Sequence, residues 1–198
     1  MSKPRFIIFL IIIYLSGCAN KNEEIQSSSP IEQSNSQDSF FPVTSYIRGQ
    51  VLLIDSLPIT PLQIISIKGK TDSTWRTKEI LKQFLAPFLT AEISETNLTK
   101  YFKETRFNDQ TIDAITFTYE PKAKLPDSIS LRRWDVYVDP EKEVVTKIYI
   151  VKHLKENGQN ITQQLTWQPG KLAKISTILN KPDGSLELLK EEQFIWNF

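Results

Sequence analysis

The spacing of apolar residues predicts helices and one strand in the first half of the folded part of the chain. Residues 44–54, and the segment that follows residues 72–74, place apolar side chains at helical intervals, which predicts two helices. Thr44 is expected to cap the first helix. Pro87 is expected to kink or end the second, because proline has no backbone N–H to donate. Between the two helices, the apolar run at residues 62–68 predicts a buried strand.

The second half of the chain changes to a period of two. A third, shorter helix is first expected after Ser94 or Thr96, with Leu98, Tyr101 and Phe102 on its apolar side. Alternating segments separated by turn residues then predict strands over residues 111–119, 131–138, 144–155, 161–167, 172–179 and 186–196. Asn157-Gly158 is the strongest hairpin signal among the turns.

Together these segments predict an α+β fold. An antiparallel β-meander sheet of six or seven strands is expected to carry two or three helices packed on one face. One domain over residues 40–198 would contain all of these elements. Residues 18–39 precede it as a polar tether, in which Ile25 and Ile31 are too few apolar residues to repay the entropy of ordering. A coil of that length measures about 25 Å from end to end.

The first eighteen residues have the order of an export signal. Lys3 and Arg5 precede the apolar run from Phe6 to Leu15, and small residues lead to Cys18, which is the only cysteine in the sequence. The stretch Leu15-Ser16-Gly17-Cys18 resembles the lipobox of bacterial lipoproteins. That resemblance implies a signal peptide over residues 1–17, cleavage after Gly17, and acylation of Cys18, so that its acyl chains hold the protein on a membrane. The alternative, a membrane-spanning anchor, needs about 20 apolar residues, twice the length of this run.

Residues after the cysteine indicate where in the cell envelope the protein is sorted. In Gram-negative lipoproteins, a residue other than aspartate at this position implies sorting to the outer membrane, and here the residue is Ala19. Lys21 followed by Glu23 and Glu24 also resembles the surface-export signal of Bacteroidota lipoproteins, although Asn22 interrupts it. The chain as a whole is similar to uncharacterised Bacteroidota envelope lipoproteins, which implies a location rather than an activity.

Charge and composition restrict the function further. The chain has 24 basic and 23 acidic side chains, and loss of Lys3 and Arg5 with the signal leaves 22 and 23. A net charge of −1 gives no electrostatic attraction to nucleic acid, so none is expected as a partner. With one histidine and with its cysteine lipidated, the mature chain is expected to hold no disulfide, no zinc site and no cofactor.

Candidate catalytic residues are few. His153 has lysines beside it on a predicted strand, and these should lower its pKa rather than orient it as a base. Asp135 and Asp139 share a strand face about 13 Å apart, which is wide for a pair of glycosidase carboxylates. Alternating charges on a solvated strand face explain both residues. A glycan hydrolase whose carboxylates are brought together by the fold remains the alternative to a binding protein.

Aromatic residues are the other candidates for function. Trp134, Trp167 and Trp196 on the predicted strands could form a ligand-binding platform for sugars or apolar surfaces, but their apolar neighbours at period two favour a core position. Tyr149 and Val151 give one predicted strand a second apolar face, which a partner or the amino-terminal segment could cover. The expected function is therefore that of a membrane-anchored lipoprotein with a non-enzymatic binding or accessory role, whose partner is an envelope protein or a glycan.

Overall fold

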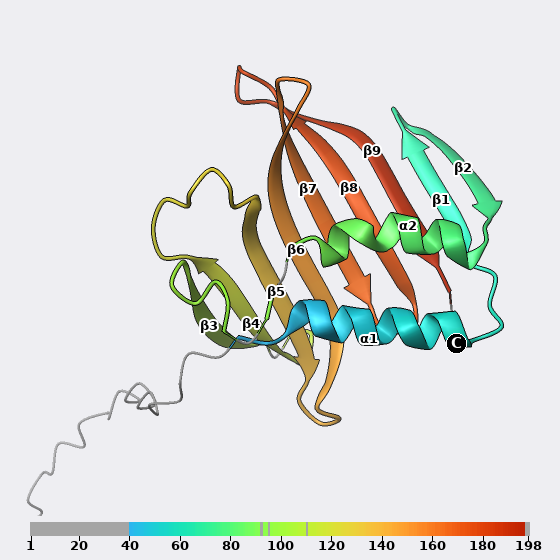
Figure 1. Cartoon of the computed structure of the whole chain (residues 1–198), viewed down its shortest axis with the longest axis horizontal. Helices are drawn as coiled ribbons and strands as arrows, with labels where there is room; N and C mark the ends of the chain where they lie inside the picture. Colours follow the sequence, from blue (N-terminus) through green and yellow to red (C-terminus); the bar gives the residue numbers. More distant parts are fainter. Residues whose placement is uncertain (1–39, 92, 95, 110, 197–198) are drawn as a thin grey trace, which may run out of the picture. The chain divides into compact units, whose positions relative to one another are not determined.

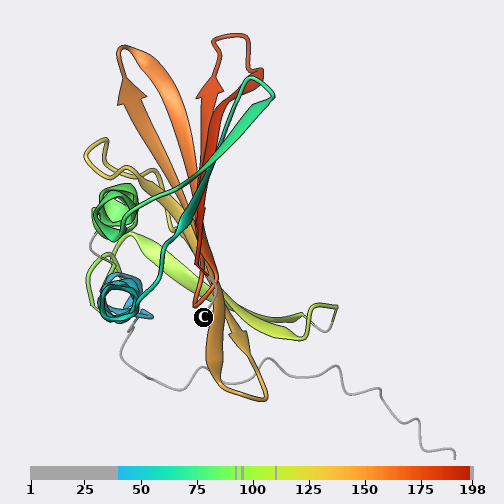
Figure 2. The ribbon, with the colours of Figure 1, turned by 90° about the vertical axis from the view of Figure 1, so that its right-hand side faces the viewer.

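The computed structural model describes residues 40–91, 93–94, 96–109 and 111–196. These residues form an α+β fold in which two helices lie on one face of an antiparallel sheet (Figures 1 and 2). The helices are α1 (Val43–Ser56) and α2 (Lys78–Leu89). The strands are β1 (Leu62–Ile67), β2 (Lys70–Trp75), β3 (Phe102–Asp109), β4 (Ala114–Pro121), β5 (Leu131–Asp139), β6 (Val144–Glu156), β7 (Gln159–Gln168), β8 (Leu172–Asn180) and β9 (Leu186–Ile195). The predicted fold class is confirmed, but the sheet has nine strands rather than six or seven.

The predicted meander forms most of the sheet. Its strands lie in the order β2-β1-β9-β8-β7-β6-β5-β4-β3, so β3 to β9 follow one another in sequence and in space. The pairing of β1 with β9 is the exception, because it joins the early β1–β2 hairpin to the last strand of the chain. The Asn157-Gly158 hairpin forms as predicted, with φ angles of 50° and 78° at its two turn residues.

Two strands were not predicted from the sequence. Every residue of β2 is exposed, and the two apolar residues of β3, Phe102 and Phe107, are five positions apart and so lie on opposite faces; neither strand therefore has a continuous apolar face. Both lie at the edges of the sheet, where one side of the strand has no neighbour to pack against. Their mainly polar composition suits a position at the edge of the sheet. It also leaves no alternation of apolar and polar residues from which a strand could be predicted.

The predicted third helix is wrong. Leu98 has a φ angle of 66°, which a right-handed helix cannot accommodate. The backbone N–H groups of Tyr101 and Phe102 both donate to the carbonyl of Leu98, at 2.8 and 3.0 Å, and form a turn that leads into β3. Thr44 also differs from the prediction, because α1 begins at Val43 and the Thr44 side chain makes no cap. Its buried hydroxyl donates to the carbonyl of Ala91 and accepts from the N–H of Ile93.

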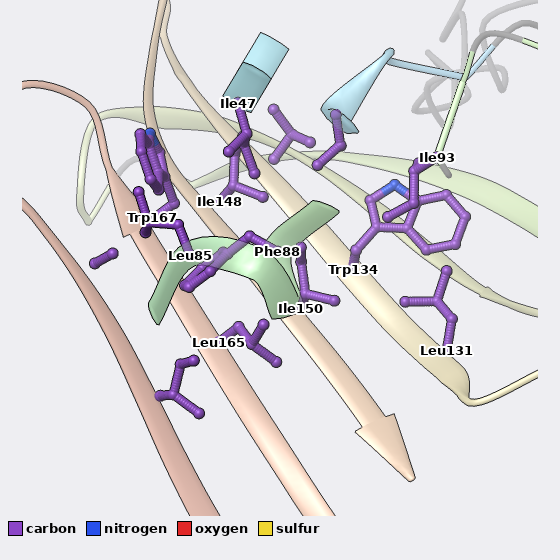
Figure 3. Packing of buried hydrophobic residues seen from close by; sticks show 14 of the residues in the cluster. Ile47, Leu85, Phe88, Ile93, Leu131, Trp134, Ile148, Ile150, Leu165 and Trp167 are labelled. Carbon is purple, nitrogen blue, oxygen red and sulfur yellow. The ribbon is translucent and has the colours of Figure 1, made fainter. Parts of the chain in front are cut away.

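The core lies between the two helices and the face of the sheet that they cover, which we call the inner face. Figure 3 shows Ile47 of α1 and Leu85 and Phe88 of α2 directed at strand residues such as Ile148 and Ile150. Pro87 lies in the last turn of α2, which ends at Leu89, in line with the prediction that this proline stops the helix. Within the described ranges, neither helix is long and apolar enough to cross a membrane.

Candidate functional site

The predicted tryptophan candidates all lie in the core. Trp134 and Trp167 are 0% exposed and Trp196 is 2% exposed. Figure 3 shows Trp134 and Trp167 among the other core side chains. Trp134 stacks on Tyr119, with ring centroids 4.6 Å apart and planes 7° apart. Trp167 packs edge-on against Phe88 of α2, at 5.9 Å. These three rings therefore pack in the core and do not form a ligand platform. The period-two alternation of their strands had already favoured a core position.

Asp135 is held in a polar network rather than on a solvated face. The residue is 1% exposed, which corrects the expectation of a solvated position. The Nε of Arg133 donates to both carboxylate oxygens, at 3.1 and 3.0 Å, and the hydroxyl of Thr118 donates at 2.7 Å. Nη1 of Arg133 also reaches Glu120 at 3.3 Å. The hydrogen bond to Asp135 raises the pKa of Arg133. Both oxygens of the buried Asp135 carboxylate are engaged by Arg133, so this side chain offers no free carboxyl for acid or base catalysis.

The other catalytic candidates have structural roles as well. Asp139 accepts the backbone N–H groups of Glu141 and Lys142, at 3.0 and 2.9 Å, and so closes the turn between β5 and β6. Burial, and then the Arg132 guanidinium, lowers the pKa of His153. The direction agrees with the prediction, but the flanking lysines are not its cause. Among the described residues, no group of three or more acidic, histidine or cysteine side chains could hold a metal ion.

The face of the sheet turned away from the helices, which we call the outer face, has no helix over it in the part of the chain that the structure describes (Figure 2). Residues alternate between the two faces along each strand. Tyr149 and Val151 therefore point outward, because Ile148 and Ile150 between them are buried under the helices. Tyr149 and Val151 are only half-buried, so the second apolar face predicted for this strand exists and lies open.

The register aligns one outward-facing residue from each of seven neighbouring strands, β2, β1, β9, β8, β7, β6 and β5, in a single line across the sheet. Strand pairing places Trp75 opposite Leu62, Leu62 opposite Ile195, Ile195 opposite Leu172, and Leu172 opposite Gln168. Gln168 and Lys147 come one residue beyond the Trp167–Ile148 pair of β7 and β6, so they face the same side of the sheet, and Lys147 pairs in turn with Tyr137. We call this line the cross-strand row; its members are Trp75, Leu62, Ile195, Leu172, Gln168, Lys147 and Tyr137. It joins an exposed tryptophan at one edge of the sheet to a tyrosine on β5, which is separated from the opposite edge by β4 and β3.

A depression of about 440 Å³ lies over the end of this row that contains Tyr137 and Lys147. We call it the outer-face depression; it is lined by Tyr137, Lys147, Tyr149, Thr166, Gln168, Leu172, Lys174 and Gln193. The Nζ of Lys147 lies 3.7 Å from the centroid of the Tyr137 ring, which is a cation–π contact. Burial, and then the Asp135 carboxylate, raises the pKa of Tyr149, so its hydroxyl remains a hydrogen-bond donor at neutral pH.

A second depression, of about 450 Å³, lies at the other end of the row. Its lining is mainly apolar and consists of Ile59, Thr60, Leu62, Trp75, Ile195 and Trp196. Trp75 is 67% exposed here, so most of its indole ring is free for contact. The two depressions are adjacent, because Ile195 in this lining pairs with Leu172 in the lining of the outer-face depression.

This arrangement provides aromatic surfaces together with hydrogen-bonding groups. The side chains of Gln168, Gln193 and Tyr149 have no hydrogen-bond partner among the described residues, so their amides and hydroxyl are available to a ligand. Aromatic rings stack on the apolar faces of other rings, and amides pair with hydroxyl groups. Sugars carry both features, and so does the surface of many proteins.

Sequence reasoning identified Tyr149 but not Trp75 as part of a binding surface. Trp75 was expected to lie before the second helix and outside any strand, since β2 has no apolar alternation. Only the pairing of β1 with β9 brings Trp75 into line with Leu172 and Gln168, and no local signal encodes that pairing. No protein-family model, curated protein or solved structure matches this chain.

Proposed function

We propose that this chain is a membrane-anchored envelope lipoprotein whose folded domain binds a glycan, without catalysis, on the outer face of its sheet. The observation that carries the proposal is the cross-strand row, which links exposed Trp75 to Tyr137 through a continuous surface. Acyl chains on Cys18 would hold the domain at the membrane, as the lipobox-like stretch implies.

Three features support a glycan as the ligand. The surface combines rings that can stack, at Trp75 and Tyr149, with the amides of Gln168 and Gln193. It also extends across several strands, so it suits an elongated chain better than a compact small molecule. A purely apolar partner would leave the amide groups without hydrogen-bond partners, at a cost in free energy.

The state of the carboxylates favours binding over hydrolysis. A glycosidase needs one carboxyl to donate a proton while a second acts as a base or nucleophile. Asp135 is held by Arg133 and Thr118, and Asp139 is held by backbone N–H groups of its own turn. Both carboxylates are therefore committed to structural contacts.

The test is binding of the full-length chain, in detergent micelles, to a panel of immobilised neutral and acidic polysaccharides. Trp75→Ala and Tyr149→Ala should each weaken binding about two- to tenfold, the loss expected for one stacking ring. Leu52→Ala is the matched control, because Leu52 on α1 is 67% exposed, as Trp75 is, but lies away from the outer face. Absence of binding to every polysaccharide, or equal losses in Leu52→Ala, would contradict the proposal.

A further inference from the structure

The charges that line the outer-face depression are all of one sign. Its charged lining residues are Lys147 and Lys174, and the remaining lining side chains are aromatic, amide, hydroxyl or aliphatic. This local positive charge is not a consequence of composition, because the mature chain is expected to have a net charge of −1. A patch of one sign on a nearly neutral protein points to a ligand of opposite charge.

Lys147 is the more available of the two cations. Its Nζ rests over the ring of Tyr137 at 3.7 Å, and no carboxylate lies within ion-pair distance of it among the described residues. The ring fixes the position of the ammonium group without neutralising its charge. Three N–H donors of a held ammonium group can then turn toward an anionic group of a ligand.

Lys174 is partly neutralised but remains in reach. Its Nζ lies 3.2 Å from Oε2 of Glu191, and the hydroxyl of Ser176 donates to the same oxygen at 3.0 Å. Glu191 thus has a second donor and does not depend on Lys174 alone. The Lys174 side chain is 35% exposed, and an ammonium group can bind a second acceptor beside its partner.

Amide donors lie next to both lysines. The register pairs Gln193 with Lys174 across β8 and β9, and places Gln168 beside Lys147 across β6 and β7. An acidic group in the depression would therefore receive N–H donors from an amide as well as from an ammonium group. Charge-assisted hydrogen bonds of this kind are stronger than neutral ones.

We infer that the glycan bound at the outer-face depression is anionic: a saccharide that carries carboxylate or sulfate groups, which Lys147 and Lys174 recognise. The inference rests on the proposed function and specifies its ligand class. Tyr149 and Trp75 contact sugar rings, and the two lysines select the acidic substituents. Binding accordingly weakens as salt concentration rises, because these lysines are exposed to screening.

The experiment measures binding of the full-length chain in micelles to two matched pairs of saccharides. Oligogalacturonate against its methyl ester tests a carboxylate, and dextran sulfate against dextran tests a sulfate. At least one acidic member should bind more tightly than its neutral counterpart. Lys147→Gln should weaken binding of that member about two- to fivefold, the range for an exposed ion pair, and should weaken binding of the neutral member by a smaller factor.

Lys171→Gln is the control, because this exposed lysine lies in the turn between β7 and β8 and outside the lining of the depression. If neutral members bind as tightly as acidic ones, or if Lys171→Gln has the same effect as Lys147→Gln, the inference fails while the proposed function stands. If no member of either pair and no polysaccharide of the wider panel binds, both fail.

Discussion

Lys152 lies on the inner face of β6 and is 3% exposed, which is unusual for a lysine that has no ion pair with any described carboxylate. Its Nζ donates to the carbonyl of Pro87 in the last turn of α2, and to the hydroxyl of Thr90 at 3.0 Å. A cation at the end of a helix is favourable. Loss of water outweighs that gain, since burial lowers the pKa of Lys152 from 10.5 to about 8. Stability should therefore depend on pH through this one residue.

The sign follows from which state binds the proton. Between pH 8 and pH 10.5 the unfolded chain keeps the Lys152 proton while the folded chain releases it, so the free energy of unfolding rises with pH. Below pH 8 both states are charged and the whole cost of burial, about 3 kcal/mol, is present. About 2 kcal/mol of this cost is removed between pH 8 and pH 10. Above that range stability falls, because burial raises the pKa values of Tyr119 and Tyr46, and the unfolded chain ionises first.

Lys152→Met removes the titrating group and keeps a side chain of similar length. The variant should lack the rise in stability between pH 8 and pH 10, and at pH 7 it should be more stable than the native chain by about 1–2 kcal/mol. The gain is smaller than the cost of burial because the carbonyl of Pro87 loses its donor. Lys155→Met, on an exposed lysine of the same strand, is the control and should keep the native pH profile.

Urea unfolding followed by tryptophan fluorescence at a series of pH values measures these differences, because three of the four tryptophans are buried in the core. A native chain whose stability does not change between pH 8 and pH 10 would refute the reasoning. So would a Lys152→Met variant that retains the same rise, since another group would then be its source.

Three further predictions concern the network, the domain boundary and the anchor. Asp135→Asn should lower the free energy of unfolding by about 1–3 kcal/mol, because Arg133 loses a buried charged partner; urea titration that shows no loss would contradict the network. Phe40→Ala should cost about 3 kcal/mol, since Phe40 is 4% exposed and packs edge-on against Tyr119 at 5.0 Å; an effect under 1 kcal/mol would move the start of the domain. Cys18→Ala should leave the precursor uncleaved and unlipidated by mass spectrometry, and normal processing would rule out the lipoprotein anchor.

The meander could be predicted from the sequence because its strands carry their own signals. Asn157 and Gly158 adopt the positive φ angles that a two-residue hairpin requires, and the strands on either side alternate at period two. Both helices of the structure were predicted for the same reason, since each buries an apolar stripe. Local pattern and tertiary packing agree in these elements.

The edge strands and the candidate site could not be predicted in this way. All residues of β2 are exposed and all but Trp75 are polar, so their strand conformation depends on pairing with β1 rather than on burial. The pairing of β1 with β9 joins segments more than a hundred residues apart, and it alone brings Trp75 into the cross-strand row. The burial of Lys152 was not predicted either, and the residue was considered only as a neighbour of His153. The packing of α2 over β6, which buries Lys152, cannot be predicted from the sequence of either segment.

Acrylamide quenching of tryptophan fluorescence tests the central claim most directly. Trp75 is 67% exposed while Trp134, Trp167 and Trp196 are at most 2% exposed, so quenching by acrylamide reports mainly on Trp75. The saccharide from the panel that binds most tightly should reduce this quenching when it covers the cross-strand row. A saccharide that binds without reducing the quenching, and that binds Trp75→Ala as tightly as the native chain, would place the ligand elsewhere and contradict the account.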